Sequence, residues 1–167
     1  MLPSDCMSGS EDPIALLRHT VATVAYRGGK ALRGAPPEFA AFRAGPQTRT
    51  PGEILAHIAD LFDWALTLAQ GKQKWNASPP LPWDQGTARF FAALEAFDLC
   101  LASGEPLACP PEKLFQGPIA DALTHIGQIA LLRRMAGAPV RGENYFKAEI
   151  TAGRTGHDQA QPVVEFG

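Results

Sequence analysis

Two histidines and one aspartate stand where helical side chains could hold a divalent metal ion. His57 lies near the start of one predicted helix, and Asp121 and His125 are four residues apart on another. Positions four apart differ by only about 40° around a helix axis, so Asp121 and His125 point the same way. Two imidazoles and one carboxylate can hold an ion and leave coordination positions open. The spacing therefore predicts a metal site between two helices.

Each of these residues also has a structural interpretation. A lone histidine on an apolar helical face is usually a core imidazole bonded to a neighbour. An aspartate such as Asp121, in the first turn of a helix, is explained by the helix dipole alone. The metal interpretation gains weight because His57 and the Asp121–His125 pair each lie within the first two turns of a predicted helix. We expect them at one depth if the two helix N-termini share an end of the fold.

Three polar residues flank the predicted ligands and are candidates for catalytic roles. Glu53 is one turn before His57, and Asp60 lies on nearly the same side of that helix, so either is a candidate general base or supporting partner. Glu53 has a competing role, because Thr50 and Glu53 have the spacing of a capping box. Gln128 follows His125 by about one turn and is expected to hold a water or to orient a ligand.

The composition favours one soluble domain over residues 1–167. A chain of 167 residues with 46% hydrophobic residues can bury one sizeable core. A net charge of −2, with the basic residues scattered, argues against nucleic-acid binding. Residues 1–10 resemble neither a signal peptide nor a membrane anchor, and no apolar run approaches membrane-spanning length. Three cysteines without paired spacing, Cys6, Cys100 and Cys109, predict neither a disulfide nor a cysteine zinc site, and they fit a reducing cytoplasm.

Apolar residues at helical spacing predict four amphipathic helices. The first opens at residues 11–13 and weakens at residues 28–29, where two glycines follow one another. The second has the clearest bounds, with Thr50 as N-cap, Pro51 in the first turn and Gly71 just past the end. Residues 34–49 between them form a long connection with one short turn around Phe39 to Phe42.

The third helix is predicted over residues 84–103 with Asp84 as its N-cap, and the fourth from Pro118 to Met135. The long connections before the second and third helices can cross the fold, so neighbouring helices need not be antiparallel. We therefore predict an all-α protein, a four-helix bundle over residues 12–137 with long crossover loops. Residues 138–167 have no sustained periodicity and predict an irregular tail on the surface.

Other residues of chemical interest are expected to be structural. His19 and His157 have no acidic or imidazole partner at helical spacing and are expected to be incidental. Cys100 is expected to be a buried thiol. The three tryptophans are expected to be packing residues and loop anchors rather than a ligand cage; they are Trp64, Trp75 and Trp83.

Two segments together resemble a known family. Residues 50–60, TPGEILAHIAD, and residues 121–128, DALTHIGQ, are similar to the DinB superfamily of metal-binding four-helix bundles. The mark of that family is a histidine early in the second helix and a His-x-x-x-His pair, often followed by x-Gly-Gln, in the last. His57, His125 and Gln128 match this pattern, and Asp121 stands where a third histidine is usual. The resemblance extends over about residues 14–135.

The resemblance implies a divalent ion, with zinc or nickel favoured. Asp121 in place of a histidine shifts the preference somewhat towards iron or manganese, because a carboxylate is a harder ligand. Some members of the superfamily transfer low-molecular-weight bacterial thiols to electrophiles or isomerise thiol adducts, and others are described as hydrolases. Residues 141–146 follow the last helix, and Asn144 and Tyr145 are the residues of this segment expected to contribute to a cofactor site.

The sequence thus predicts a cytoplasmic, metal-dependent enzyme whose bound ion activates a water or a thiol against a small-molecule substrate. The alternative is a non-catalytic small-ligand-binding module or a homodimeric interaction module with a degenerate metal site. The third helix, with Phe90, Phe91 and Phe97, is aromatic enough to be shared between the core and the interface of such a homodimer.

Overall fold

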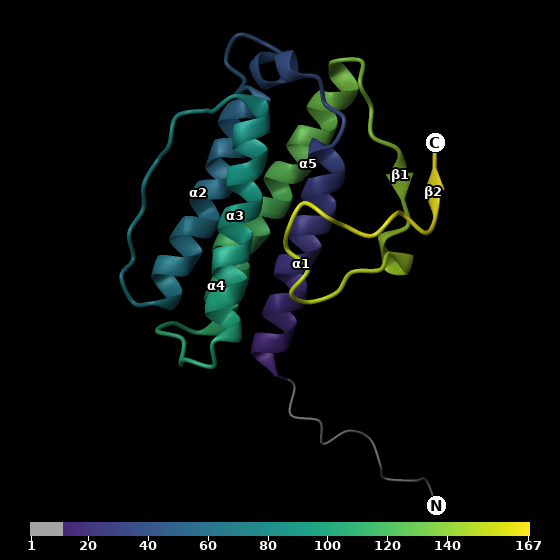
Figure 1. The fold of residues 1–167 in the computed structure, drawn as a ribbon. Coiled ribbons are helices and arrows are strands. Elements are labelled where there is room, and N and C mark those ends of the chain that lie inside the picture. The colour runs from purple at the N-terminus through teal and green to yellow at the C-terminus, as the bar shows by residue number, and fades with distance from the viewer. Residues whose placement is uncertain (1–11) are drawn as a thin grey trace, which may run out of the picture.

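The computed structural model describes residues 12–167, so the predictions for Cys6 and for the start of the chain lie outside the described residues. Four long helical stretches lie side by side within that range (Figure 1). Their bounds are α1 (Pro13–Leu32), α2 (Pro51–Ala69), α3 (Trp83–Ala102) and a continuous stretch of α4 (Pro111–Leu114), η2 (Phe115–Ile119) and α5 (Ala120–Met135). A short 3-10 helix, η1 (Pro37–Ala41), precedes α2 at the predicted turn. The chain is therefore mostly helical, as the sequence predicts.

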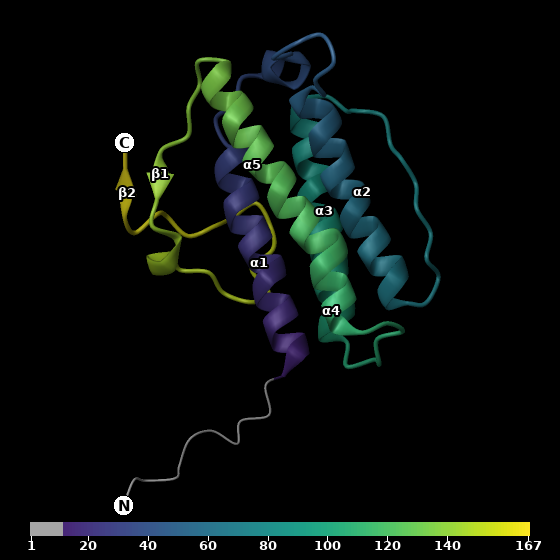
Figure 2. The same cartoon turned by 180° about the vertical axis from the view of Figure 1, so that it is seen from behind.

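The helices run in two directions. In Figure 1 and, from behind, in Figure 2, α1 and α5 run one way and α2 and α3 run the other. Residues 70–82 therefore travel back along the length of α2 before α3 begins. Helix α2 packs against α3 and α5, and α1 packs against the same two helices. The two helices that carry the predicted metal ligands, α2 and α5, are thus antiparallel neighbours.

The predicted start of α2 is confirmed in atomic detail. The Thr50 side chain accepts a bond from the Glu53 backbone N–H at 3.2 Å, and the Glu53 carboxylate accepts one from the Thr50 N–H at 2.6 Å. This capping box satisfies two backbone donors that the first turn leaves without partners. The predicted N-cap of α3, Asp84, is wrong by two residues. Pro82 is at the N-cap, the helix begins at Trp83, and Asp84 lies inside its first turn.

The last helical stretch begins earlier than its sequence predicts. Pro118 was expected to open it, because proline is typical of a first turn. Instead Pro111 opens it, and Pro118 lies inside the π-helical turn η2, between α4 and α5. Proline lacks the N–H that an α-helix interior uses, and the wider π turn accommodates this missing donor. Residues 111–117, predicted as loop, are therefore helical.

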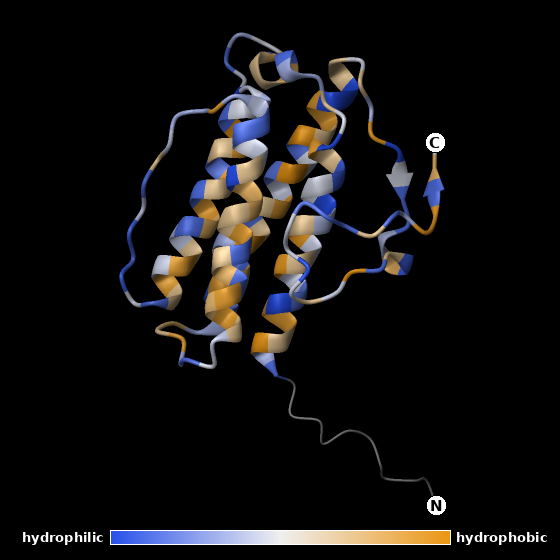
Figure 3. Ribbon diagram, in the orientation of Figure 1, coloured by the Kyte–Doolittle hydropathy of each residue, from blue (hydrophilic) through white to orange (hydrophobic). Residues whose placement is uncertain are grey.

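The apolar stripes of the helices face one shared core. Figure 3 shows hydrophobic and hydrophilic residues on every long helix, as amphipathic helices require. Phe90, Phe91 and Phe97 of α3 are all buried in this core, so these three rings are not available to the dimer surface that the sequence predicts. Among residues 12–167, no helix combines the length and the apolar character that crossing a membrane requires.

Residues 138–167 are more ordered against the helices than the sequence predicts. Strand β1 (Gly142–Glu143) pairs antiparallel with β2 (Glu165–Phe166), and a 3-10 helix, η3 (Tyr145–Lys147), follows β1 (Figure 1). Strands of two residues leave no periodic pattern in the sequence, which is why neither was predicted.

Buried Glu143 attaches this tail to α1. It accepts a bond from the Tyr26 hydroxyl at 2.6 Å and one from the Lys30 ammonium at 2.7 Å, and Lys30 also reaches Glu165 at 2.7 Å. Burial, together with the bond to Glu143, raises the pKa of the Tyr26 phenol far above its ordinary value. Tyr26 therefore stays protonated and keeps donating to Glu143.

Gly28 is required by packing rather than by a helix end, since α1 continues past it to Leu32. A Cβ at Gly28 would lie 2.5 Å from Cζ of Phe90, which is fully buried. Gly28→Ala is expected to lower the free energy of unfolding by about 1–3 kcal/mol through overpacking, measured by urea denaturation. Gly127→Ala is the matched control inside α5, where an added Cβ meets nothing within 4 Å. It is expected to be neutral or stabilising by up to about 1 kcal/mol, and equal losses in both variants would contradict this packing.

Glu143→Gln tests the attachment of the tail. Loss of the charged acceptor is expected to lower the free energy of unfolding by about 1–3 kcal/mol, because the bond to a buried ammonium is weakened. Glu149→Gln is the control, since Glu149 is exposed and belongs to none of the ion pairs of residues 12–167. A Glu143→Gln protein as stable as the control would show that the charge of Glu143 does not attach the tail.

Candidate metal centre

The three predicted ligands meet in space. His57 on α2 faces Asp121 and His125 on α5, and one donor atom from each residue lies within 4.8 Å of the other two. Asp121 bridges the imidazoles, with 3.4 Å from one carboxylate oxygen to Nε2 of His57 and 3.4 Å from the other to Nε2 of His125. The two rings stand almost perpendicular, with centroids 4.7 Å apart. We call these residues the His–Asp–His cluster.

The spacing of these donors fits a small divalent cation. Ligand atoms about 2.0–2.2 Å from a tetrahedral zinc ion lie about 3.3–3.6 Å from one another, and each imidazole Nε2 lies 3.4 Å from an Asp121 oxygen, a different oxygen for each ring. Two neutral imidazoles and one carboxylate are ligands that zinc, nickel, iron and manganese accept. Three protein ligands leave at least one position open for a further group. The cluster therefore has the donor types of the predicted ion, and its three donor atoms, within 4.8 Å of one another, could hold one.

The cluster converges for a different reason from the one expected. The sequence prediction assumed that α2 and the last helix start at the same end of the fold. They run antiparallel instead, and His57 lies in the second turn of α2 whereas α4 and η2 place His125 well inside the last helical stretch. Because the two helices are antiparallel, the second turn of α2 lies beside the later turns of the last helical stretch.

Gln128 orients one of the ligands. Its side-chain oxygen lies 2.8 Å from Nδ1 of His125, so Nδ1 carries the proton and donates it. Nε2 of His125, on the other side of the ring, is then left with its lone pair towards Asp121 and His57. Such a partner fixes the tautomer and the orientation of a metal-binding imidazole. The predicted role of Gln128 in orienting a ligand agrees with this contact.

The cluster is open to solvent on the side of the carboxylate. The side chain of Asp121 is 46% exposed, whereas those of His57 and His125 are 22% and 13% exposed. The imidazoles thus form the inner wall, and a small molecule approaching from outside meets Asp121 first.

The surroundings keep His57 neutral. Burial lowers the pKa of His57, and the charge of a protonated His125 lowers it further, while the bond to Asp121 opposes both. The pKa stays below its ordinary value of 6.5, so the lone pair of His57 is available at neutral pH. A neutral imidazole is the form that binds a metal.

Glu53 is engaged at the start of α2 rather than in the cluster. Its carboxylate accepts the Thr50 N–H and lies 3.7 Å from the Arg43 guanidinium. The bonds from Thr50 are the main reason that the pKa of Glu53 is lowered. The structure therefore supports the capping role, and it does not bring the predicted catalytic carboxylate to the ligands.

Asp60 is also turned away from the cluster. It is buried and accepts bonds from the Arg89 guanidinium at 2.6 Å and from the backbone N–H of Ser78 at 2.8 Å. Ser78 belongs to the connection that crosses back along α2. Asp60 thus anchors this connection in place, and both of its oxygens are committed, so it is poorly suited to the predicted role of general base.

Asn144 and Tyr145 lie with the tail on α1. The Asn144 side chain caps η3 by accepting the Phe146 N–H at 3.2 Å. The Tyr145 ring meets the edge of the Tyr26 ring and lies 4.1 Å beneath the Arg27 guanidinium. These partners all belong to α1 or to the tail, so the structure does not bring the predicted cofactor residues to the His–Asp–His cluster.

Two tryptophans beside the cluster were missed as site residues. The Trp75 ring meets the His57 ring edge to face at 5.6 Å, and the Trp64 ring meets Trp75 at 5.8 Å. Trp64 also lines an open hollow of about 420 Å³ that reaches Asp121. The spacing of Trp64, seven residues after His57 and so on the same helical face, could have suggested its place. No sequence pattern could place Trp75, because only the folded connection brings it to His57.

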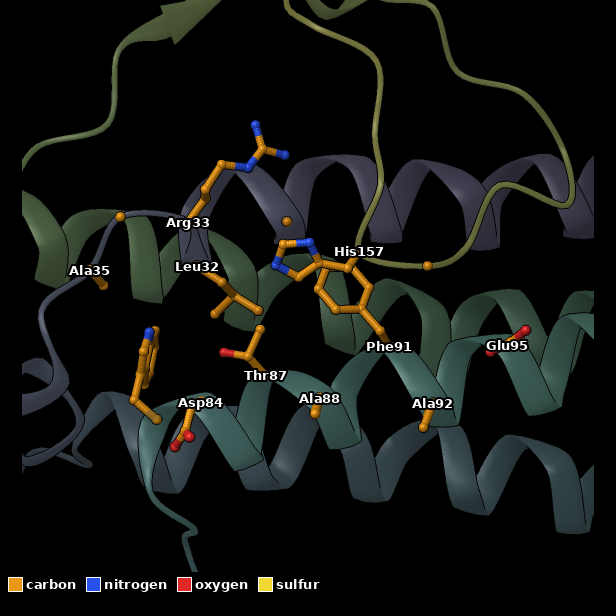
Figure 4. Close-up of a pocket in the computed structure, with 14 residues that line it drawn as sticks. Leu32, Arg33, Ala35, Asp84, Thr87, Ala88, Phe91, Ala92, Glu95 and His157 are labelled. Atoms are coloured by element: carbon orange, nitrogen blue, oxygen red, sulfur yellow. The ribbon is translucent and has the colours of Figure 1, made fainter.

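A second hollow lies away from the cluster, between α1, α3 and the tail. Figure 4 shows it; its volume is about 540 Å³, and its lining includes Arg33, Thr87, Phe91 and His157 but no residue of the His–Asp–His cluster. His157, expected to be incidental, packs edge to face on Phe91 with centroids 5.4 Å apart. The Thr87 hydroxyl oxygen is buried and has no hydrogen-bond partner among residues 12–167.

The cysteines of the described residues are poor nucleophiles. Cys100 and Cys109 are free and partly buried, and burial raises the pKa of both thiols. A thiol with a raised pKa carries little thiolate at neutral pH.

The titration of His57 in metal-free protein tests the electrostatics of the cluster. By NMR its pKa is expected below 6.5, further lowered in Asp121→Asn and moved back towards 6.5 in His125→Ala. Because the folded pKa lies below the unfolded one, the unfolded chain takes up this proton first. The contribution of His57 to stability is therefore complete above about pH 6.5 and is lost as the pH falls through the folded pKa. A His57 pKa above 6.5, or one that Asp121→Asn raises, would contradict the burial and the contacts described above.

Comparison with known proteins finds no matching family model, no matching curated protein and no matching solved structure. The similarity to the DinB superfamily thus rests on residues 50–60 and 121–128 alone. The geometry of the His–Asp–His cluster does not depend on that similarity, since the distances hold whichever family the chain belongs to.

Proposed function

We propose that this chain is a metal-dependent enzyme of the DinB-like type, with one divalent ion bound by His57, Asp121 and His125. One observation carries the proposal: His57 and Asp121, 64 residues apart in the sequence, converge with His125 so that three donor atoms lie within 4.8 Å. Helical bundles build metal sites in this way, from inward side chains on facing helices. We infer that the four helical stretches form such a bundle, with residues 70–82 as its long crossover.

Zinc or nickel is the proposed ion, with iron or manganese next because one ligand is a carboxylate. When bound, such an ion lowers the pKa of a coordinated water or thiol towards neutrality and so supplies a nucleophile. The proposed reactions are hydrolysis and transfer of a thiol to an electrophile, with a small molecule as substrate. A low-molecular-weight thiol is the leading candidate, in a cytoplasmic and homodimeric protein.

The surrounding residues have positioning roles in this proposal. Gln128 holds His125 in the tautomer that presents Nε2, and the exposed side of Asp121 faces incoming molecules. Asp60 acts at a distance, because it fixes the connection that carries Trp75 against His57. Glu53 has no catalytic role here, since its carboxylate is occupied at the N-terminus of α2.

A small-ligand-binding module without catalysis is the second candidate. The observation in its favour is the hollow of Figure 4, which is of ligand size and shares no residue with the metal cluster. Metal-free protein that keeps its full stability, with no thermal shift on adding zinc, nickel or manganese, would favour this module.

Metal content decides between the two. Purified untagged protein, loaded with zinc and dialysed, is expected to retain about one equivalent by mass spectrometry of the metal. His57→Ala is expected to lose more affinity than the about 10–100-fold that removal of a supporting partner costs, and Gln128→Ala is expected to fall within that range. His19→Ala is the control, because His19 is exposed on α1 outside the cluster. Equal zinc in the His57→Ala and His19→Ala proteins would overturn the site.

A further inference from the structure

The aromatic rings beside the metal cluster form a continuous row. From His125 the row passes to His57 at 4.7 Å, to Trp75 at 5.6 Å and to Trp64 at 5.8 Å, each pair meeting edge to face. The first two rings are proposed metal ligands and the last two are indoles. The indole rings therefore begin an apolar surface directly behind a residue that would contact the proposed ion.

The open hollow next to this row connects it to the cluster. Asp121 and Trp64 both line it, one a proposed ligand and the other the end of the row. Leu61 and Ala120 add apolar surface, and Gln116 and Thr124 are the two uncharged polar residues of the lining. The Thr124 hydroxyl already donates to the Ala120 carbonyl at 3.1 Å, which leaves the Gln116 amide as the polar group on this side.

The charge of the lining limits what it can hold. Its residues include no lysine, arginine or histidine, and Asp121 is its one charged group. A phosphate or a second carboxylate would find no cationic side chain in this lining, and it would meet the negative charge of Asp121. Arg49, whose charge helps to lower the pKa of His57, does not line the hollow. The lining thus suits an uncharged group.

Trp75 supplies the second reason to expect an apolar ligand. Its side chain is 45% exposed although indole is a large hydrophobic group, and the bond from the Ser78 N–H to Asp60 holds its loop in place. An exposed and fixed tryptophan beside a polar centre is typical of a recognition surface, because a bound molecule covers it.

We propose that the substrate has an uncharged apolar body, aromatic or branched aliphatic, which packs on Trp64 and Trp75 while its polar head reaches the ion. This rests on the proposed metal function and adds the class of substrate. Trp64 and Trp75 set the specificity, and His57, Asp121 and His125 hold the ion to which the head binds.

Three hydroxamates with the same head and different bodies test the proposal in cobalt-loaded protein. The visible spectrum of cobalt reports binding of the head, so the measurement does not depend on turnover. Phenylacetohydroxamate is expected to bind about 10–100-fold more tightly than acetohydroxamate, the range expected for burying one aromatic ring. Succinic monohydroxamate, whose body is negatively charged, is expected to bind no more tightly than acetohydroxamate.

The preference is the ratio of the affinity for phenylacetohydroxamate to the affinity for acetohydroxamate. The Trp64→Ala and Trp75→Ala proteins are each expected to lose at least two thirds of this ratio and to keep their affinity for acetohydroxamate. Trp64→Phe, which keeps an aromatic ring on α2, is expected to restore part of the preference and guards against a folding defect. Leu99→Ala is the matched control, because Leu99 is 62% exposed on α3 and does not line the hollow.

The outcomes distinguish failure of the apolar substrate from failure of the proposed metal function. If the protein binds cobalt but binds phenylacetohydroxamate no more tightly than acetohydroxamate, the proposed apolar substrate is overturned and the metal function stands. Tighter binding of succinic monohydroxamate would have the same meaning. Absence of cobalt binding in wild-type protein would overturn both. A preference that survives in Trp64→Ala and in Trp75→Ala would place the apolar contact on other residues and would equally overturn the proposal.

Discussion

The register between α2 and α5 is the constraint on which the proposed site depends. The two oxygen–nitrogen distances of 3.4 Å exist only while His57 stands level with Asp121 and His125. A slip of one helical turn would move the ligands about 5.4 Å apart along the axis, beyond the reach of one ion. Buried apolar residues on both helices oppose such a slip, among them Ile58, Phe62, Ala122 and Ile126. Apolar packing between α2 and α5, rather than polar contacts, thus keeps the three proposed ligands aligned.

The segments that cover the two sides of the helical core differ in how much of it they leave exposed. On one side the tail closes over α1 through buried Glu143, which stabilises that helix and covers its surface. On the other side the connection 70–82 is held by Asp60 but leaves the cluster and Trp75 accessible. On the tail side the contacts of Glu143 are buried, whereas on the α2–α5 side Asp121 and Trp75 remain exposed. This division is the physical basis for assigning function to the α2–α5 face.

Much of the helical organisation could be predicted because local signals mark it. The capping box of Thr50 and Glu53 and the glycine after α2 gave the bounds of that helix, and the i, i+4 spacing put Asp121 and His125 on one face. The start of the last helical stretch was wrong because Pro118 has the same local meaning at a first turn as in a π turn. The relative direction of α2 and α5 depends on tertiary packing, so local signals do not predict how His57 comes to lie level with Asp121 and His125.

The roles of single side chains were harder to predict than their presence. Asp60 and Glu53 have the right type and spacing for catalysis, but partners distant in sequence or a local cap take their carboxylates. Trp75 comes to His57 only through a folded connection, and the short strands of the tail leave no period to detect. These features depend on contacts between segments far apart in the chain, which a local pattern does not contain.

A zinc-soaked crystal measured at the zinc absorption edge tests the central claim most directly. The account predicts one anomalous peak between α2 and α5, about 2.0–2.2 Å from Nε2 of His57, Nε2 of His125 and an oxygen of Asp121. A zinc peak bound elsewhere on the chain, with these three side chains free of metal, would contradict it.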